Sequence, residues 1–142
     1  MRIGDILSWT RTFHEDDVRA FSLVLVSGDE GRQHVLPDAA GRLMLQGLLT
    51  ATLPSKIGGE LNFLARQMTL RFHRPVFVGD TIRCAVRVDR LDGPPGRLRL
   101  VCSWACTNQE GTLVMSGGSE GVILQPSDPS ASADGGSESR DR

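Results

Sequence analysis

The fold is decided by the apolar segment LMLQGLLTATL at residues 43–53. A helix formed by this segment would be apolar nearly all round, so it has to be buried. Pro54 follows directly and is expected to kink or end the helix, and Gly58-Gly59 is expected to close the segment. A buried helix needs other elements around it, so the rest of the chain must provide a cover.

Four extended segments provide it, and they occupy residues 61–72, 80–91, 98–107 and 112–124. In the second, Ile82, Cys84, Val86 and Val88 alternate with polar neighbours, which is typical of a half-buried strand. Short turns between segments predict an antiparallel meander. Gly117-Gly118 is expected to loosen the last strand.

The N-terminal part predicts a strand at residues 6–11 and then a helix. Thr12 and Glu15 fit a capping box, with Thr12 as the N-cap. Apolar residues at helical spacing follow, namely Val18, Phe21, Val24 and Leu25. Gly28 suits the end of this helix.

Together these elements predict a single α+β domain over residues 1–124, a curved antiparallel sheet wrapped around a central helix. Residues 125–142 are rich in Ser, Asp and Gly and have no apolar anchor, so we expect a disordered tail. A sheet of this size has exposed edges, which a second copy commonly covers.

Bulk properties narrow the function. The net charge is −1 and no basic run is present, so neither nucleic acid nor an anionic membrane is an expected partner. We expect no signal peptide and no membrane span. The three cysteines, Cys84, Cys102 and Cys106, do not have zinc-site spacing and fall in predicted strands, so we expect small buried residues in a reducing cytoplasm and no metal site. We also expect no cofactor.

One loop carries candidate chemistry. Residues 27–34 read SGDEGRQH, which places Asp29 and His34 five positions apart. A loop of this length can direct both groups at one bound water, a common arrangement for moving protons near neutral pH. The alternative is ordinary turn chemistry beside a solvated histidine.

Three motifs in order resemble the MaoC-like, (R)-specific enoyl-CoA hydratases of the hotdog-fold superfamily. They are Ser-Gly-Asp-x4-His at residues 27–34, QGLLTA at residues 46–51 and LRFHRPVFVGD at residues 70–80. The last is similar to the family's Arg-Phe-x-x-Pro-Val-x-x-Gly-Asp signature. The resemblance covers residues 5–124.

The resemblance implies a hotdog homodimer with one continuous sheet and an acyl-thioester substrate carried on CoA or acyl carrier protein. It implies that Asp29 and His34 are the catalytic pair and that the Gly47 N–H binds the thioester carbonyl; a simple tight turn is the alternative for Gly47. The family commonly has Asn-Pro where this chain has Gly31-Arg32. Arg32 then adds a cation near the mouth of the site.

The expected activity is hydration of an enoyl thioester or dehydration of a 3-hydroxyacyl thioester, a hydro-lyase reaction. One rival is a hotdog thioesterase, although residues 48–57 contain no carboxylate of the kind several such families place on the central helix. Another is a non-catalytic acyl-CoA-binding module.

The remaining candidate residues rank lower: His14, His73, Arg42, Arg66 and Arg71 as surface or structural residues, and Trp9 and Trp104 as core or interface residues.

Overall fold

The computed structural model describes residues 1–25 and 32–125. Its elements are β1 (Ile6–Thr12), α1 (Glu15–Leu25), η1 (Arg32–His34), α2 (Gly47–Thr50), α3 (Thr52–Glu60), β2 (Phe63–Phe72), β3 (Thr81–Asp92), β4 (Arg97–Thr107) and β5 (Leu113–Leu124). The predicted tail at residues 126–142 and the loop at residues 26–31 lie outside the described residues.

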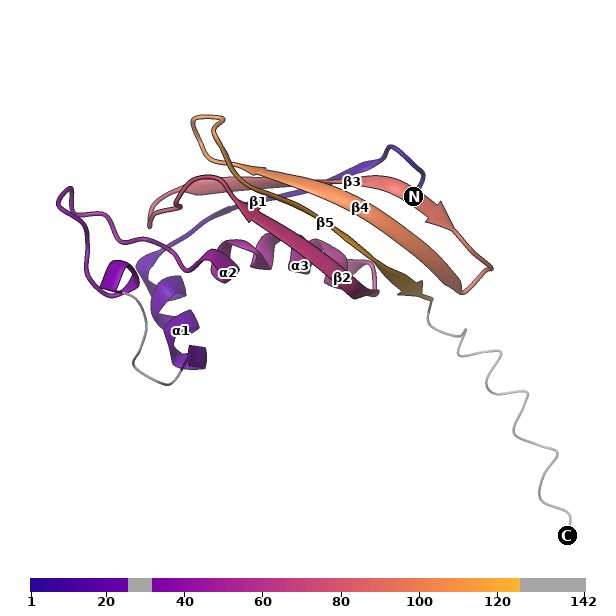
Figure 1. The fold of residues 1–142 in the computed structure, drawn as a ribbon, viewed down its shortest axis with the longest axis horizontal. Helices are drawn as coiled ribbons and strands as arrows, with labels where there is room; N and C mark the ends of the chain where they lie inside the picture. Colours follow the sequence, from indigo (N-terminus) through magenta and orange to yellow (C-terminus); the bar gives the residue numbers. More distant parts are fainter. Residues whose placement is uncertain (26–31, 126–142) are drawn as a thin grey trace, which may run out of the picture.

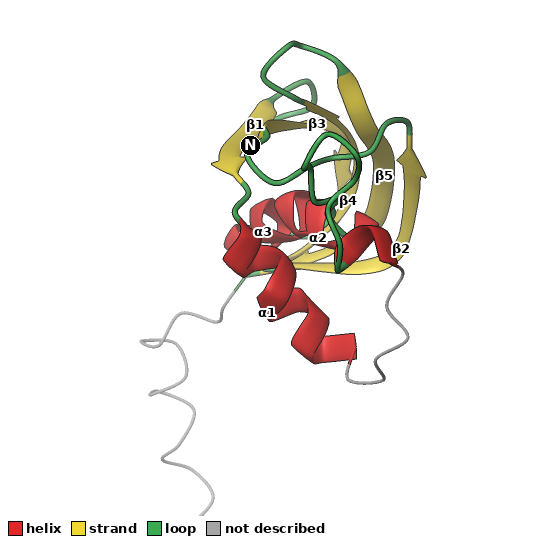
Figure 2. Cartoon of the chain, turned by 90° about the vertical axis from the view of Figure 1, so that its left-hand side faces the viewer, coloured by secondary structure: helices red, strands yellow, loops and turns green. Residues whose placement is uncertain are grey.

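The five strands form one antiparallel sheet in the order β1-β3-β4-β5-β2, and it curves around α2 and α3 (Figures 1 and 2). The predicted α+β arrangement is confirmed. The predicted four-strand meander is wrong for β2, which pairs with β5 at the far edge. The reason is that β2 and β3 are not joined by a tight turn. In the connection between them, Val76 and Val78 form backbone hydrogen bonds with the segment before α2, and the connecting chain therefore crosses the helix before β3 begins.

The central helix has two parts, α2 and α3, which meet at Ala51. Pro54 is the third residue of α3, where a missing N–H costs little because the first N–H groups of a helix have no intrahelical partner. The helix is thus divided at Ala51, three residues before Pro54, and is not ended by the proline. The expected closure at Gly58-Gly59 is correct to within one residue: α3 ends at Glu60, its C-cap bonds go to the Gly58 and Gly59 carbonyls, and Ile57 is buried beneath it.

The start of α1 also differs from the prediction. Thr12 still belongs to β1, and its hydroxyl lies 2.7 Å from that of Thr81. Phe13 is fully buried, and its backbone N–H donates to the backbone carbonyl of Asp80. This bond keeps Phe13 outside the helix. The cap therefore forms two residues later than expected, where the Asp17 carboxylate accepts the His14 N–H at 2.8 Å.

The helix α1 buries its first half more deeply than its second. Val18 is 1% exposed and Phe21 is half-buried, whereas Val24 is 74% exposed. Val24 was expected to share the apolar stripe, so that part of the prediction is wrong. Figure 2 shows α1 leaving the sheet toward its C-terminal end, which explains the exposure.

The core lies between the concave face of the sheet and the central helix. The three cysteines are buried and free, as predicted, and Cys84 lies opposite Cys106 on neighbouring strands. The hydrogen bond to Cys84, together with burial, raises the pKa of the Cys106 thiol far above its ordinary value. These residues are therefore packing residues with a protonated thiol at Cys106.

The predicted loosening of β5 does not occur, since the strand is continuous through both glycines. A Cβ at Gly117 would lie 2.1 Å from the Thr69 carbonyl oxygen and 2.8 Å from the Trp104 ring. Gly117 is therefore required for close approach: it lets β2 and the indole of Trp104 pack against β5.

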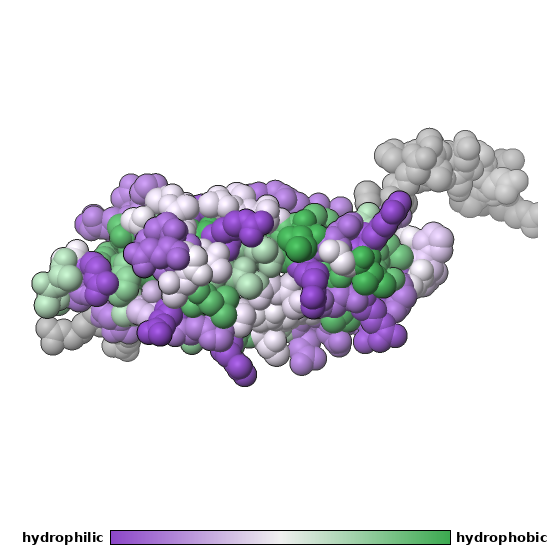
Figure 3. All heavy atoms as spheres, turned by 90° about the horizontal axis from the view of Figure 1, so that it is seen from above, coloured by the Kyte–Doolittle hydropathy of each residue, from purple (hydrophilic) through white to green (hydrophobic). Residues whose placement is uncertain are grey.

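The convex face of the sheet is largely hydrophilic, with smaller apolar areas between (Figure 3). Some of its charges are paired along and across strands, as in Arg87–Asp89 at 2.8 Å and Arg99–Glu120 at 3.5 Å. Arg66 is exposed, as expected for a surface charge. In the described part of the chain, no helix is long and apolar enough to cross a membrane.

Candidate active site

The site is framed by the short extended segment that precedes α2. The backbone N–H of Leu45 donates to the carbonyl oxygen of Val76 at 2.8 Å, and the N–H of Val78 donates to the carbonyl oxygen of Leu43 at 2.9 Å. The Asp80 carboxylate closes the opposing turn by accepting the Phe77 N–H at 2.9 Å. The third sequence motif therefore has a structural role, which is to hold the segment that leads into the central helix.

His34 is anchored to this same segment. Its Nδ1 lies 2.8 Å from the carbonyl oxygen of Met44, and the side chain is half-buried. A carbonyl can only accept, so Nδ1 carries a proton, and in the neutral imidazole Nε2 then carries the lone pair. Gln33 agrees with this tautomer, because its amide nitrogen lies 3.4 Å from His34 Nε2 and can donate to it. His34 thus presents a basic nitrogen.

Gln46 connects the other side of the loop to the helix start. Its side chain is buried, and its Nε2 donates to the Val18 carbonyl at 3.2 Å and to the Ser22 hydroxyl at 3.1 Å. The helix α1 is thereby fixed against the N-terminal end of α2. Gln46 belongs to the second motif, but its bonds to α1 could not be read from the sequence.

Both flanks of residues 26–31 are therefore attached to the segment around residues 44–46. Asp29 falls inside this interval, outside the described residues, and its pairing with His34 stays a prediction. Arg32 opens η1, but its side chain also lies outside the described part. Its placement near the mouth of the site is likewise a prediction.

Gly47 is the first residue of α2, and its φ is not positive, so a tight turn does not explain the glycine. A Cβ at this position would lie 3.0 Å from the ring of Phe72. Phe72 is 52% exposed and was not singled out from the sequence, although it stands in the third motif. The first N–H groups of a helix lack intrahelical partners and suit an anionic or carbonyl oxygen.

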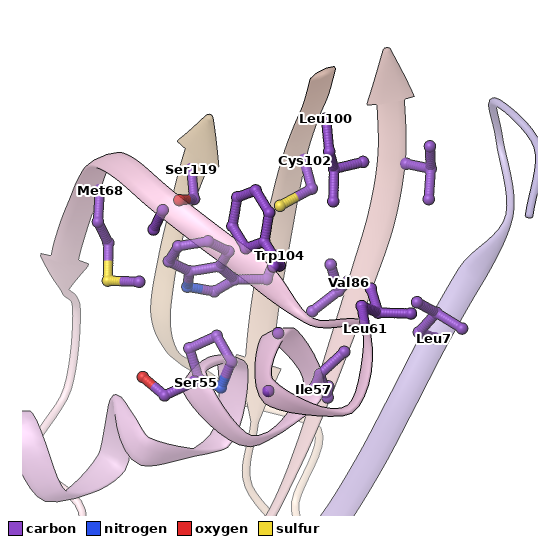
Figure 4. A pocket seen from close by; sticks show the side chains of 16 residues that line it. Leu7, Ser55, Ile57, Leu61, Met68, Val86, Leu100, Cys102, Trp104 and Ser119 are labelled. Atoms are coloured by element: carbon purple, nitrogen blue, oxygen red, sulfur yellow. The ribbon is translucent and has the colours of Figure 1, made fainter. Parts of the chain in front are cut away.

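Two hollows lie near the central helix, one beside these groups and one farther along, at α3. One, of about 340 Å³, lies beside Gln33 and Met44, with the Arg42 guanidinium 4.2 Å from the centre of the Phe77 ring. The Arg42 guanidinium also pairs with the Asp38 carboxylate at 3.0 Å. The backbone N–H of Arg42 donates a hydrogen bond to the same carboxylate, and this bond is the main cause of the lowered pKa of Asp38. The other is an apolar cavity of about 230 Å³ between α3 and the sheet (Figure 4).

Among the described residues, no group of three or more His, Cys, Asp and Glu side chains converges as a metal site. Trp104 is 5% exposed, in keeping with a core residue, but it also forms part of the wall of the apolar cavity. Trp9 is half-buried, and the Lys56 ammonium lies 4.4 Å from the centre of its ring.

Comparison with known proteins agrees with this geometry. The model of the thioesterase superfamily matches residues 39–94. A mitochondrial 3-hydroxyacyl-[acyl-carrier-protein] dehydratase of Arabidopsis thaliana is 27% identical, over 87% of this chain and 78% of the relative.

Two solved structures extend the comparison. The (R)-hydratase of A. caviae involved in PHA biosynthesis is 25% identical, with a TM-score of 0.74 over 88% of this chain and 98% of that one. The MaoC-like dehydratase from Rhodospirillum rubrum is 17% identical, with a TM-score of 0.68 over 88% and 94%, which shows the fold. The chain has the hotdog fold, and its resemblance to the MaoC-like hydratases and dehydratases is confirmed.

Proposed function

We propose that the protein is an (R)-specific hydro-lyase that adds water to, or removes it from, the 2,3-bond of an acyl thioester carried on CoA or acyl carrier protein. The observation that carries this proposal is the hydrogen bond from His34 Nδ1 to the Met44 carbonyl, which leaves Nε2 as a base near the start of α2. The names of the dehydratase relative and the (R)-hydratase neighbour support the same reaction.

In the hydration direction, His34 Nε2 takes a proton from water while the oxygen attacks C3 of the enoyl thioester. Negative charge develops on the thioester oxygen, and we assign its stabilisation to the Gly47 N–H, reinforced by the aligned peptides of α2. The proton taken from water is then delivered to C2 through the pair formed by His34 and Asp29. No proton is gained or lost overall, and dehydration follows the same steps in reverse.

Arg32 is proposed to act on the carrier rather than on the reacting carbons. A guanidinium near the mouth of the site would pair with a phosphate of CoA or of the acyl carrier protein. The expected effect of Arg32→Ala is therefore a higher KM with kcat nearly unchanged.

We further propose a homodimer formed through β2. This edge strand has three exposed apolar side chains, Leu64, Met68 and Phe72, with exposed fractions of 55%, 40% and 52%. Pairing with the same strand of a second copy would cover them and join the two sheets. Light scattering of the purified chain tests this, and Met68→Arg is expected to yield monomers. A monomeric parent protein would contradict it.

The buried free thiols support a reducing compartment, and we propose the cytoplasm. Fractionation of the host cells would test this location directly.

The activity test is hydration of crotonyl-CoA, followed by the loss of enoyl absorbance and by the stereochemistry of the product. Asp29→Ala and His34→Ala are each expected to lower turnover by at least about a hundredfold, the usual scale for acid–base groups. His14→Ala is the matched control, because His14 caps α1 through its backbone N–H. Unchanged turnover in both site variants would eliminate this mechanism.

Thioester hydrolysis is the second candidate, and the match to the thioesterase superfamily favours it. Within α2 and α3 the one acidic residue is Glu60, which is exposed and pairs with Lys56. A catalytic carboxylate on the buried face of this helix is therefore absent. Release of free thiol without loss of the double bond would identify a thioesterase, and binding without either reaction would identify an acyl-CoA-binding module.

A further inference from the structure

The side-chain carboxamide of Gln33 lies next to the proposed catalytic base. Its nitrogen stands 3.4 Å from His34 Nε2, the ring nitrogen that carries the lone pair in the neutral imidazole. Gln33 is also the one carboxamide residue in the sequence from residue 27 to residue 34. A donor this close to the basic nitrogen can contact whatever molecule that nitrogen binds.

One residue, Met44, holds Gln33 and His34 in a fixed relation to each other. The backbone N–H of Met44 donates to the Gln33 carbonyl oxygen at 3.2 Å, and the Met44 carbonyl oxygen accepts from His34 Nδ1 at 2.8 Å. The main chain at Gln33 and the ring of His34 are therefore both attached to the segment that leads into α2. The Gln33 side chain starts from a fixed point beside the imidazole, and only its own torsions are free.

The surroundings of Gln33 leave room for a water molecule. Its side chain is exposed and forms part of the wall of the hollow of about 340 Å³, so water reaches the carboxamide. The separation of the two nitrogens exceeds the usual hydrogen-bond range of about 2.7–3.2 Å, so their direct bond is weak. A rotation of the side chain that widens this gap by about 1 Å lets one oxygen lie about 2.9 Å from both nitrogens.

We infer that Gln33 is a further catalytic residue: its carboxamide N–H donates to the oxygen of the reacting water while this water donates to His34 Nε2. The inference rests on the proposed function. In hydration the O–H bond breaks toward His34 as the bond from oxygen to C3 forms, so the oxygen gains negative charge, which the N–H stabilises. In dehydration the same N–H stabilises the departing oxygen while His34 protonates it. Gln33 gives up no proton, so the proton balance of the reaction is unchanged.

The test compares two variants in the hydration of crotonyl-CoA. Gln33→Met removes the donor and keeps the length of the side chain, whereas Gln33→Glu keeps the shape but places an acceptor and a negative charge beside the water. We expect kcat to be about tenfold to a hundredfold lower in Gln33→Met, the scale of a hydrogen bond to an oxygen that gains charge, and lower still in Gln33→Glu. KM should stay within about twofold, because the carboxamide contacts the water and not the thioester. Gln125→Met is the matched control, since it removes an exposed carboxamide just after β5, and it should keep wild-type turnover.

A second measurement separates this role from support of the imidazole. The nitrogen NMR signals of the His34 ring, assigned with His34→Ala, show which ring nitrogen carries the proton, and they should be the same in the wild type and in Gln33→Met because the bond to Met44 remains. A changed tautomer, an unchanged kcat or a loss confined to KM would overturn the inference. Full turnover in Gln33→Met beside an inactive His34→Ala would refute this inference alone, whereas a wild-type protein without hydratase turnover would refute the proposed function and the inference with it.

Discussion

Gly47→Ala separates a catalytic role of the helix start from a purely steric one. The added Cβ would lie 3.0 and 3.1 Å from two atoms of the Phe72 ring, whereas carbon atoms normally approach to about 3.5–4.0 Å. The ring must therefore move by a few tenths of an ångström. Phe72 is half exposed in the single chain, and the close contacts are with atoms of its ring rather than with backbone, so a small rotation of the side chain relieves them.

The backbone favours the substitution, since alanine is better than glycine in a helix by about 0.5–1 kcal/mol. We therefore expect the free energy of unfolding to change by less than about 1 kcal/mol, as measured by urea denaturation. Turnover of crotonyl-CoA should fall about a hundredfold or more, the usual cost of losing one oxyanion donor, because the methyl group stands beside the N–H that we propose binds the thioester oxygen.

Gly47→Ala combined with Phe72→Leu is the control, because the smaller side chain relieves the contact. Turnover should stay low in this double variant. Restored turnover would show that the methyl acts by displacing Phe72, and full activity of Gly47→Ala alone would refute the role assigned to the Gly47 N–H.

Three further predictions concern packing. Gly121→Ala places a Cβ 2.0 Å from the Leu64 carbonyl oxygen and should lower the free energy of unfolding by about 2 kcal/mol or more. Its control is Gly59→Ala, whose Cβ meets nothing within 4 Å and which should raise the free energy of unfolding by about 0.5–1 kcal/mol. Similar effects of the two substitutions would contradict the pairing of β2 with β5. Gln46→Leu removes two hydrogen bonds to α1 and should destabilise the protein by about 1–3 kcal/mol in the same assay, and a neutral result would count against that anchor. Cys106 should resist iodoacetamide in the native protein and react once it is unfolded, so native labelling followed by mass spectrometry would expose an error in its burial.

The strands and the central helix could be predicted because their signal is local. Alternation along β3 and β4 and the apolar run before Pro54 each report directly on burial. The position of β2 at the far edge could not be predicted in this way, because alternation shows that a strand is half-buried but not which strand it pairs with. That choice depends on the long-range pairing of Val76 and Val78 with the segment before α2.

The shifted start of α1 also arises from contacts distant in sequence. The cap of α1 moved because Phe13 is held by residues near β3, and this overrides the local preference for Thr12 as a cap. Gly58 stayed helical because burying Ile57 outweighs a glycine cost of about 1 kcal/mol.

The site could be predicted only in part. The motif identified His34, but its anchor is the carbonyl of Met44, and a backbone oxygen has no sequence signature. The contact of Gln33 with the imidazole was equally hidden, because adjacency in sequence does not show where two side chains point.

The anchor of His34 has an evolutionary consequence. Every amino acid has a main-chain carbonyl, so exchanging the side chain at position 44 leaves the imidazole with its acceptor as long as the extended segment persists. Sequence drift can therefore change the side chain at position 44 while the imidazole of His34 keeps its hydrogen-bond acceptor.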